Sequence, residues 1–287
     1  MMTTFQNRVT FAKEQLSLFV RHQSPLGKTQ NARIPIRIET KRYIIKSAES
    51  TGDRNQVFRL RYQVFHREQL GKKFPVGLDI DRFDLHCDHL MIIDQESGAC
   101  IGTYRMLCSS FTDDFYSRQE FDLEPVLRLP GIKVELGRAC VDHRFRKGSV
   151  LNLLWRGVGA YIQKAGASYL FGCASLHTTN SKELSAIMSF LSEQKHLCRD
   201  FWLQTQPGYL PARAVSASRN SSTHSNDAKS IPSLPSLLIS YLTAGAKVCG
   251  GPAIDRSMDC SDFFTLLDLK NTNPQFAKRY DLCSAPS

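Results

Sequence analysis

Residues 134–176, VELGRACVDHRFRKGSVLNLLWRGVGAYIQKAGASYLFGCASL, carry the pattern that decides the fold. Residues 134–141 are rich in β-branched and apolar side chains, which predicts a strand. Residues 150–165 have apolar side chains at helical spacing, and Gly166 is a plausible stop for that helix. Residues 169–176 predict a second short strand. We therefore expect a strand–helix–strand unit at the centre of the fold.

A basic, glycine-containing turn joins the first strand to the helix. The first N–H groups of a helix lack intrahelical partners and the helix dipole is positive there, so such a turn suits a phosphate group. Ser149 is also a plausible N-cap of the helix. An ordinary exposed basic loop is the alternative, and spacing alone leaves both interpretations open. The candidate phosphate ligands are Arg144, Arg146, Gly148 and Ser149.

Glu135 and Arg138 are charged residues inside the apolar strand. Buried charges are costly unless they are paired or used in chemistry. In a regular strand the two side chains would face opposite sides, and a β-bulge would bring them to one side. A structural ion pair and a catalytic pair both remain open.

The chain has 287 residues, of which 42% are hydrophobic and 22% charged, so it can bury a core without metals or disulfides. Residues 1–73 hold 15 Lys/Arg and 5 Asp/Glu, whereas the other 214 residues hold 22 of each. The net charge of +10 therefore belongs to the N-terminal quarter. That region suits an acidic protein or an anionic lipid. We expect no nucleic-acid partner, because no aromatic-interleaved motif accompanies the basic residues.

Nine cysteines without a C-x-x-C pair indicate free thiols in a reducing compartment. The uncharged stretch 230–246 contains two prolines and several serines, which makes it a poor membrane span. We expect a cytoplasmic protein, with at most peripheral contact at the inner face of an anionic membrane.

The rest of the chain predicts alternating strands and helices. We expect a basic arm over 1–38 and one domain over 39–287 that contains a flexible loop at 207–235. The order predicts an α/β fold (α+β in its mixed sheet), with a central mixed sheet and helices on both faces. Further strands are expected at 43–45, 90–94, 100–107, 201–203 and 263–269, and further helices at 55–70 (ended by Gly71), 181–194 and 234–246.

The loop 74–89 has a dense acidic cluster. A loop that binds a cationic group and a solvated loop both explain it better than a metal does. We expect no metal, because no further ligand cluster accompanies the histidines and the cysteine. The residues concerned are Asp79, Asp81, Asp84, His86, Cys87, Asp88 and His89.

The element order and the phosphate-type turn resemble the GNAT superfamily of acyltransferases. Four motifs resemble the acyl-homoserine-lactone synthases within it: RYQVF at 61–65, LDIDRFD at 78–84, Arg105, and ELGR at 135–138. A closer resemblance, over residues 40–280, is to the ornithine N-α-acyltransferases. It lies in Phe83-Asp84, Cys87-Asp88-His89-Leu90, LLWRG at 153–157, LFGCASL at 170–176 and VCGGPA at 248–253.

This resemblance implies the first step of ornithine-lipid synthesis. A 3-hydroxyacyl chain would move from acyl carrier protein to the α-amine of ornithine. The acyl-phosphopantetheine of the carrier would be a co-substrate, with no tightly bound cofactor. The alternatives are transfer to glycine, lysine or glutamine, lactone synthesis, and a non-catalytic module that binds carrier protein or membrane.

Acyl transfer to an amine requires a neutral amine, a bound thioester and donors for the oxyanion. We expect Glu135 to be the base, directly or through water, and Arg138 to orient it or the acyl carbonyl. A strand N–H exposed by a bulge near Gly137 would serve the oxyanion. A structural salt bridge is the alternative for each charged residue. The residues expected to bind the amino acid, the donor loop or the acyl chain are Arg61, Phe65, Asp81, Asp84 and Arg105.

Overall fold

The computed structural model describes residues 17, 18, 20, 32–146, 149–213, 215 and 234–282. They belong to two compact units. Most of the predicted arm and most of the predicted loop at 207–235 lie outside the described residues, so the division into arm, domain and loop stays a prediction. Unit 1 contains 1–113, 134–167 and 280–287, and unit 2 contains 114–133 and 168–279.

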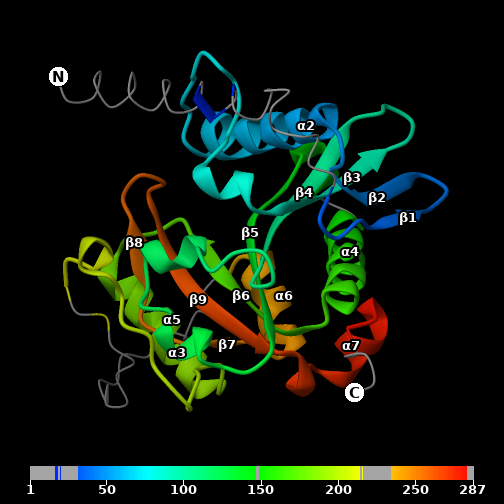
Figure 1. Ribbon diagram of the computed structural model, residues 1–287. Helices are drawn as coiled ribbons and strands as arrows, with labels where there is room; N and C mark the ends of the chain where they lie inside the picture. The colour runs from blue at the N-terminus through cyan, green and yellow to red at the C-terminus, as the bar shows by residue number, and fades with distance from the viewer. Residues whose placement is uncertain are drawn as a thin grey trace. The chain divides into compact units, whose positions relative to one another are not determined.

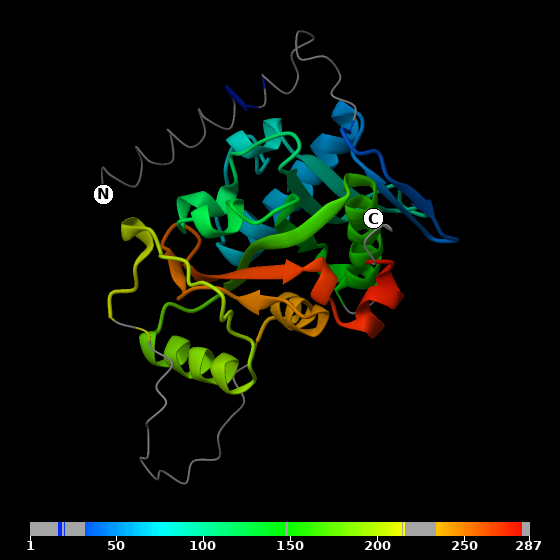
Figure 2. The same ribbon diagram turned by 60° about the horizontal axis from the view of Figure 1, so that its bottom comes forward.

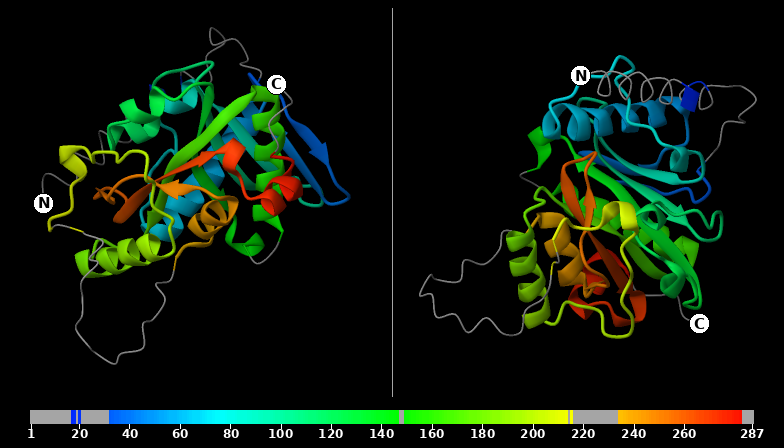
Figure 3. Two further views of the ribbon diagram at one scale, coloured as in Figure 1. Left: turned by 90° about the horizontal axis from the view of Figure 1, so that it is seen from below. Right: turned by 90° about the vertical axis from the view of Figure 1, so that its left-hand side faces the viewer.

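Unit 1 has five strands in the order β1-β2-β3-β4-β5 among its described residues, each antiparallel to the next (Figure 1). The hairpin of β1 and β2 is the blue pair in Figure 3. The strands predicted at 90–94 and 100–107 are confirmed as β3 and β4, which form a hairpin whose turn contains Gly98 at φ 67°. The strands are β1 (Arg37–Glu39), β2 (Tyr43–Ser47), β3 (Asp88–Asp94), β4 (Cys100–Cys108) and β5 (Ile132–Val141).

Helices α2 (Thr51–Arg61) and α4 (Val150–Ala165) cover opposite faces of these strands (Figure 1). Met91 packs in one core cluster with the apolar side chains of α2. The adjacent Leu90 points to the other face of the strand, toward α4. A methyl group on Gly157 of α4 would come within 2.5 Å of Leu90 Cδ2, so this glycine permits the close packing of helix and strand.

Helix α2 continues directly as a π-helix, η1 (Tyr62–Gln69), in which hydrogen bonds span five residues. The predicted helix at 55–70 is confirmed, but it begins earlier and changes type halfway. Its start follows from a capping box, because the side chains of Ser50 and Asp53 each accept the other's backbone N–H. Gly71 follows the helix at φ 61°, as predicted.

Unit 2 is built around β9 (Figure 2), which pairs with β6 along one edge and with β7 and β8 along the other. These pairs are antiparallel, and two parallel bridges, Leu197 with Val248 and Leu203 with Gly250, make the pairing mixed. The predicted strand at 201–203 is wrong, because Leu203 makes only an isolated bridge there. The strands are β6 (Ala167–Leu176), β7 (Lys247–Val248), β8 (Ala253–Asp255) and β9 (Cys260–Asp268).

The remaining helices are short. The predicted helices at 181–194 and 234–246 are confirmed within two residues as α5 and α6. The predicted α/β class, with a mixed sheet and helices on both faces, is confirmed. The further helices are α3 (Glu124–Leu127), α5 (Ser181–Glu193), α6 (Ser236–Ala244) and α7 (Pro274–Tyr280), with 3-10 turns at Arg82–Leu85, Tyr116–Gln119, His143–Phe145, Pro207–Tyr209 and Leu269–Asn271.

The helices of the described residues are too short or too polar to cross a bilayer. A transmembrane helix needs about 20 apolar residues. Helix α4, for comparison, has 16 residues and carries Arg156 and Lys164.

Candidate active site

Strand alternation brings three polar side chains to the face of unit 1 that α2 covers. His89 on β3 is opposite Arg105 on β4, and Arg105 is opposite Gly137 on β5. Glu135 is two residues from Gly137, so its side chain points to the same face. Met91, two residues after His89, packs against α2 and so identifies the face. All three polar side chains are buried, and the ring of His89 packs edge-on against Phe58 of α2, with ring centroids 5.2 Å apart.

The loop before β3 supplies the carboxylates that meet this face. Asp81 accepts the backbone N–H of Phe83 at 2.9 Å, and Asp84 accepts the backbone N–H of Asp81 at 2.8 Å. This capping box starts the short helix η2 (Arg82–Leu85). The three-residue spacing of the two aspartates thus has a local structural cause, and it fixes where both carboxylates point.

Arg61, the last residue of α2, is bound by two aspartates at once. Its Nη1 and Nη2 atoms donate to the two oxygens of Asp84 at 2.7 and 3.0 Å, and its Nε donates to Asp79 at 2.7 Å. The Arg61 side chain is only 1% exposed. Bidentate arginine–carboxylate pairs are the stronger kind of ion pair, and this one lies entirely inside the protein.

Arg105 and Arg138 share the third carboxylate. Arg105 Nη1 lies 2.7 and 2.6 Å from the two oxygens of Asp81, and Arg138 Nη2 donates to Asp81 at 3.2 Å. Arg138 Nε also lies 3.6 Å from Asp79. Three arginines therefore meet three aspartates, and we call this set the arginine–aspartate cluster: Arg61, Arg105, Arg138, Asp79, Asp81 and Asp84.

A β-bulge in β5 makes this arrangement possible. Two residues, Arg138 and Ala139, stand opposite the single residue Tyr104, because Gly137 pairs with Arg105 and Cys140 pairs with Thr103. Arg138 itself has φ 49°, a left-handed conformation that a non-glycine residue seldom adopts. The bulge turns Arg138 to the side of Arg105, since both reach Asp81. The predicted bulge is thereby confirmed.

The arginines keep the buried carboxylates ionised. Desolvation acts to raise the pKa of Asp84, but Arg61 and Arg105 outweigh it and hold that pKa well below its usual range. Desolvation is likewise outweighed at Asp79, where Arg61 and Arg138 lower the pKa. Asp79 and Asp84 are thus ionised at neutral pH, and the arginines that they contact compensate their charge.

Two residues that bind within this site were not predicted to do so. His66 was not a candidate at all, and Asp79 was named only as a member of the acidic loop. His66 Nε2 lies 3.1 Å from Asp79 Oδ1, on the same carboxylate that Arg61 binds. Arg61 and His66 are five residues apart, and the π-helix places such residues on one side of the helix. An unexpected helix type therefore hid His66, whereas Asp79 stood in the acidic loop as a visible signal.

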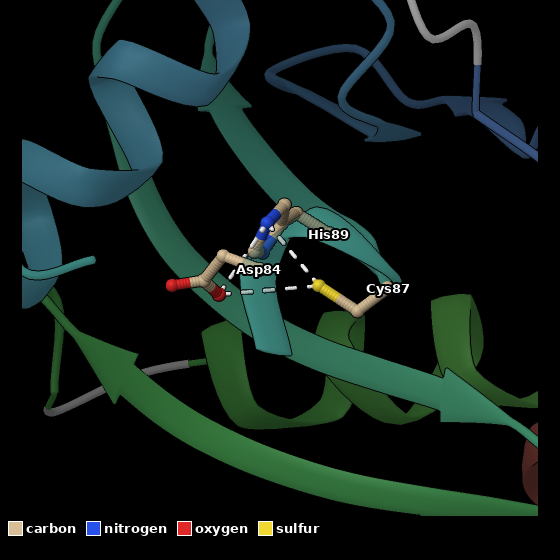
Figure 4. A group of neighbouring side chains, drawn as sticks. All are labelled: Asp84, Cys87 and His89. Carbon is tan, nitrogen blue, oxygen red and sulfur yellow. Dashed lines mark hydrogen bonds and ion pairs between the residues drawn. The ribbon is translucent and has the colours of Figure 1, made fainter. Parts of the chain in front are cut away.

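Figure 4 shows Asp84, Cys87 and His89, whose types and proximity are those of a metal site. The Cys87 sulfur lies 3.4 Å from His89 Nε2, and Asp84 Oδ1 lies 3.7 Å from the same nitrogen. Asp84, however, already binds Arg61, whose charge opposes a cation. Burial and then Asp84 raise the pKa of Cys87, which keeps the thiol protonated. The predicted lack of a metal stays a prediction.

The turn before α4 lies outside the arginine–aspartate cluster. Arg144 donates to Asp142 at 3.0 and 2.8 Å, and Arg146 donates to Glu68 at 2.5 Å and to the Val141 carbonyl at 3.0 Å. Both arginine side chains are well exposed.

Ser149 and Gly148 complete the predicted phosphate turn. Ser149 is the N-cap residue of α4, as predicted, but its φ of −80° and ψ of −1° are helical and its side chain makes no capping hydrogen bond. Gly148 lies outside the described residues. Phosphate binding at this turn stays a prediction.

The structure brings together most of the predicted site residues. Phe65 is half-buried, with its ring centroid 5.9 Å from the Arg138 guanidinium carbon. The most accessible members of the cluster are Asp81 and Arg138, whose side chains are 23% and 20% exposed. Direct contact between these residues and the amino acid stays a prediction.

Comparison with known proteins gives the family. Residues 60–156 match the acetyltransferase (GNAT) domain family. An L-ornithine N(alpha)-acyltransferase of Rhizobium meliloti (strain 1021) is 30% identical over 254 residues, which cover 81% of this chain and 82% of that protein. This chain belongs to the L-ornithine N(alpha)-acyltransferase family.

Further members of the L-ornithine N(alpha)-acyltransferase family show the same likeness. The Brucella abortus (strain 2308) protein is 28% identical over 282 residues, which cover 93% of this chain and 95% of the relative.

The structure of the CoA-dependent acyl-homoserine lactone synthase BjaI aligns at 15% identity and a TM-score of 0.42, over 81% of this chain and 82% of that one. Membership of the L-ornithine N(alpha)-acyltransferase family makes this enzyme an acyltransferase. Its whole arginine–aspartate cluster lies within the matched GNAT segment.

Proposed function

We propose that this enzyme transfers a 3-hydroxyacyl chain from acyl carrier protein to the α-amine of L-ornithine. The product is lyso-ornithine lipid, and the reaction is the first step of ornithine-lipid synthesis. The observation that carries the proposal is the charged cluster beside Glu135, in a chain 30% identical to an L-ornithine N(alpha)-acyltransferase. The cluster offers both signs of charge to a zwitterionic amino acid.

The amino acid binds to the two most accessible members of the cluster, Asp81 and Arg138. The carboxylate of Asp81 suits an ammonium group, and the guanidinium of Arg138 suits a carboxylate. The other four members of the cluster lie in the interior, with side chains at most 7% exposed, and support this pair from there: Arg61, Arg105, Asp79 and Asp84. A fixed Asp81–Arg138 pair loses little freedom when it binds the substrate.

Proton transfer falls to Glu135. The ornithine α-ammonium must lose a proton before its nitrogen attacks the thioester carbonyl. Glu135 takes that proton directly or through water, on the face that carries Arg105. The tetrahedral oxyanion then forms, accepts a hydrogen bond from backbone N–H at the β5 bulge, and collapses as the thiol leaves. The amide bond forms while the thioester bond breaks.

The donor and the location follow from charge. The excess of +10 in residues 1–73 favours an acidic carrier protein, and it also favours peripheral contact with an anionic membrane from the cytoplasmic side. We assign the phosphate of the phosphopantetheine arm to the turn that contains Arg144 and Arg146.

Donor preference tests the proposed function. Purified enzyme is offered the same 3-hydroxyacyl group on acyl carrier protein and on coenzyme A, with L-ornithine as acceptor. We expect a higher kcat/KM with the carrier protein, because only the carrier offers an acidic surface to the basic quarter. A higher value with coenzyme A would overturn the carrier assignment, and glycine, lysine or glutamine as a better acceptor would overturn the ornithine assignment.

The phosphate turn gives a second test. Arg146→Ala should raise the donor KM by about two- to fivefold at low salt, the scale of an exposed ion pair. The effect should shrink as ionic strength rises, because an exposed contact is screened. The matched control is Arg128→Ala, which removes another exposed arginine with a glutamate partner. An unchanged donor KM at low salt would show that the turn is an ordinary loop.

A further inference from the structure

Cys198 and Cys249 lie side by side in unit 2. Leu197 and Val248 are partners in a parallel bridge, and each cysteine directly follows one of them. The backbone N–H of Cys198 donates to the Val248 carbonyl at 2.8 Å. Neighbouring strands are about 4.8 Å apart, which lies within the range of Cα distances that a disulfide spans.

Cys198 is the first residue of a loop whose backbone N–H groups point toward the Cys198 sulfur. Leu203 pairs with Gly250, so five residues, 198–202, stand opposite Cys249 alone. The backbone N–H groups of Asp200 and Phe201 donate to the Cys198 sulfur. Serine and aspartate side chains cap turns in the same way, from the first residue of the turn. The loop thus builds a set of donors around one sulfur atom.

The Cys249 thiol contacts the Cys198 sulfur, and its own sulfur also lies 3.5 Å from the Lys247 carbonyl, so its proton is shared between these two acceptors. Its hydrogen bond, together with the N–H groups of Phe201 and Asp200, outweighs desolvation and lowers the pKa of Cys198 to about 6. The same hydrogen bond and burial raise the pKa of Cys249. Cys198 is the half-buried member of the pair and Cys249 the fully buried one, so the negative charge belongs on Cys198.

Four other cysteines of the described residues have a different environment. Burial raises the pKa of Cys87, Cys100, Cys140 and Cys260, so these thiols are protonated at neutral pH. Protonated thiols are poor nucleophiles, whereas an accessible thiolate reacts with peroxides and alkylating agents.

We propose that Cys198 is a peroxide-reactive thiolate and that Cys249 resolves its oxidation by closing a reversible disulfide. The Cys198 sulfur attacks the O–O bond of a hydroperoxide, is oxidised by two electrons to the sulfenic acid, and releases the alcohol, or water from hydrogen peroxide. The Cys249 sulfur then attacks the Cys198 sulfur. The S–S bond forms, the S–O bond breaks, and the hydroxide leaves as water with the Cys249 proton.

The alkylation rate of Cys198 tests the thiolate in the wild-type chain. Reduced full-length protein is treated with iodoacetamide between pH 5 and 9, and each cysteine is followed by peptide mass mapping. For a thiol of pKa about 6, the rate at pH 6.5 should stay within about twofold of its plateau. An ordinary thiol of pKa near 8.5 is about hundredfold slower at pH 6.5 than at its plateau.

Peroxide treatment tests the disulfide. Equimolar hydrogen peroxide should link the Cys198 and Cys249 peptides in the wild type. Cys249→Ser should instead accumulate a Cys198 sulfenic acid that dimedone traps. Cys173→Ser, which removes another half-buried cysteine of unit 2, should form the link as the wild type does.

Two results would overturn the proposal. One is a Cys198 alkylation profile that follows an ordinary thiol. The other is peroxide oxidation that leaves Cys198 reduced or joins it to a cysteine other than Cys249. Alkylation uses the unaltered protein, so a variant that fails to fold leaves this test in force.

Discussion

Glu135→Gln is expected to retain the fold and to lose about a hundredfold or more of its acyl-transfer rate near neutral pH. Glutamine keeps the size and the hydrogen-bonding atoms of glutamate but cannot take a proton from the ornithine ammonium. Glu135 is only 2% exposed. It lies two residues before Gly137, which is opposite Arg105, so Glu135 and Arg105 share one face of the sheet. The acidic limb of the pH–rate profile should change as well, because it reports the base.

The structural alternative for Glu135 predicts a different pair of measurements. A residue that only holds the strands together would lower Tm on substitution, and protein that stays folded would keep its kcat. Measuring both quantities on one preparation separates the two roles, with the exposed Glu124→Gln as the matched control. A well-folded Glu135→Gln with a near-wild-type kcat would remove this residue from the mechanism.

Asp84→Asn should lower the free energy of unfolding by about 3–5 kcal/mol, the scale for breaking a buried ion pair. The substitution leaves Arg61, which is 1% exposed, with one fewer carboxylate inside the protein. Denaturant titration measures the loss, provided that the m-value is unchanged. Asp94→Asn is the matched control, because Asp94 pairs with the largely exposed Arg42, and it should cost less. Equal losses in the two variants would contradict a special role for the cluster.

The pH dependence of this stability has a defined sign. Asp79 and Asp84 have lower pKa values in the folded chain than the usual value of about 3.9 in an unfolded one. Their contribution is therefore complete above about pH 4 and is lost as the pH falls further through the folded pKa values. The difference in Tm between wild type and Asp84→Asn should stay constant from pH 7 to 5 and shrink below about pH 4. A difference that changed between pH 7 and 5 would point to another group.

Sequence patterns predicted the elements whose information is local. The helix at 150–165 has the predicted bounds because its apolar period lies inside the segment and its left-handed glycine stop, Gly166, directly follows it. The predicted bulge followed from two charges in an apolar strand. Strands β1, β7 and β8 escaped prediction because two or three residues show no periodicity, and their pairing depends on distant partners.

The ion pairs of the site could not be predicted either, because they too join residues that are distant in the sequence. The sequence placed Asp81 and Asp84 in one loop and Arg61 and Arg105 elsewhere, as candidates for substrate contact. It could not show that these four bind one another, because Arg61 and Asp84 are 23 positions apart in the chain and meet only when it folds. Nor could it show that the serine before α4 adopts a helical conformation and leaves its hydroxyl unused as a cap.

The π-helix η1 accommodates one more residue between Arg61 and His66 than an α-helix would need to bring the same two side chains together. In an α-helix, two residues five apart are separated by about 140° around the axis, because each residue turns about 100°. Hydrogen bonds over five residues stack them instead, which brings Arg61 and His66 to one carboxylate. A homologue one residue shorter between them would need an ordinary α-helix, in which residues four apart are stacked, to reach the same arrangement. A one-residue gap in an alignment of this segment is therefore compatible with an unchanged site in space.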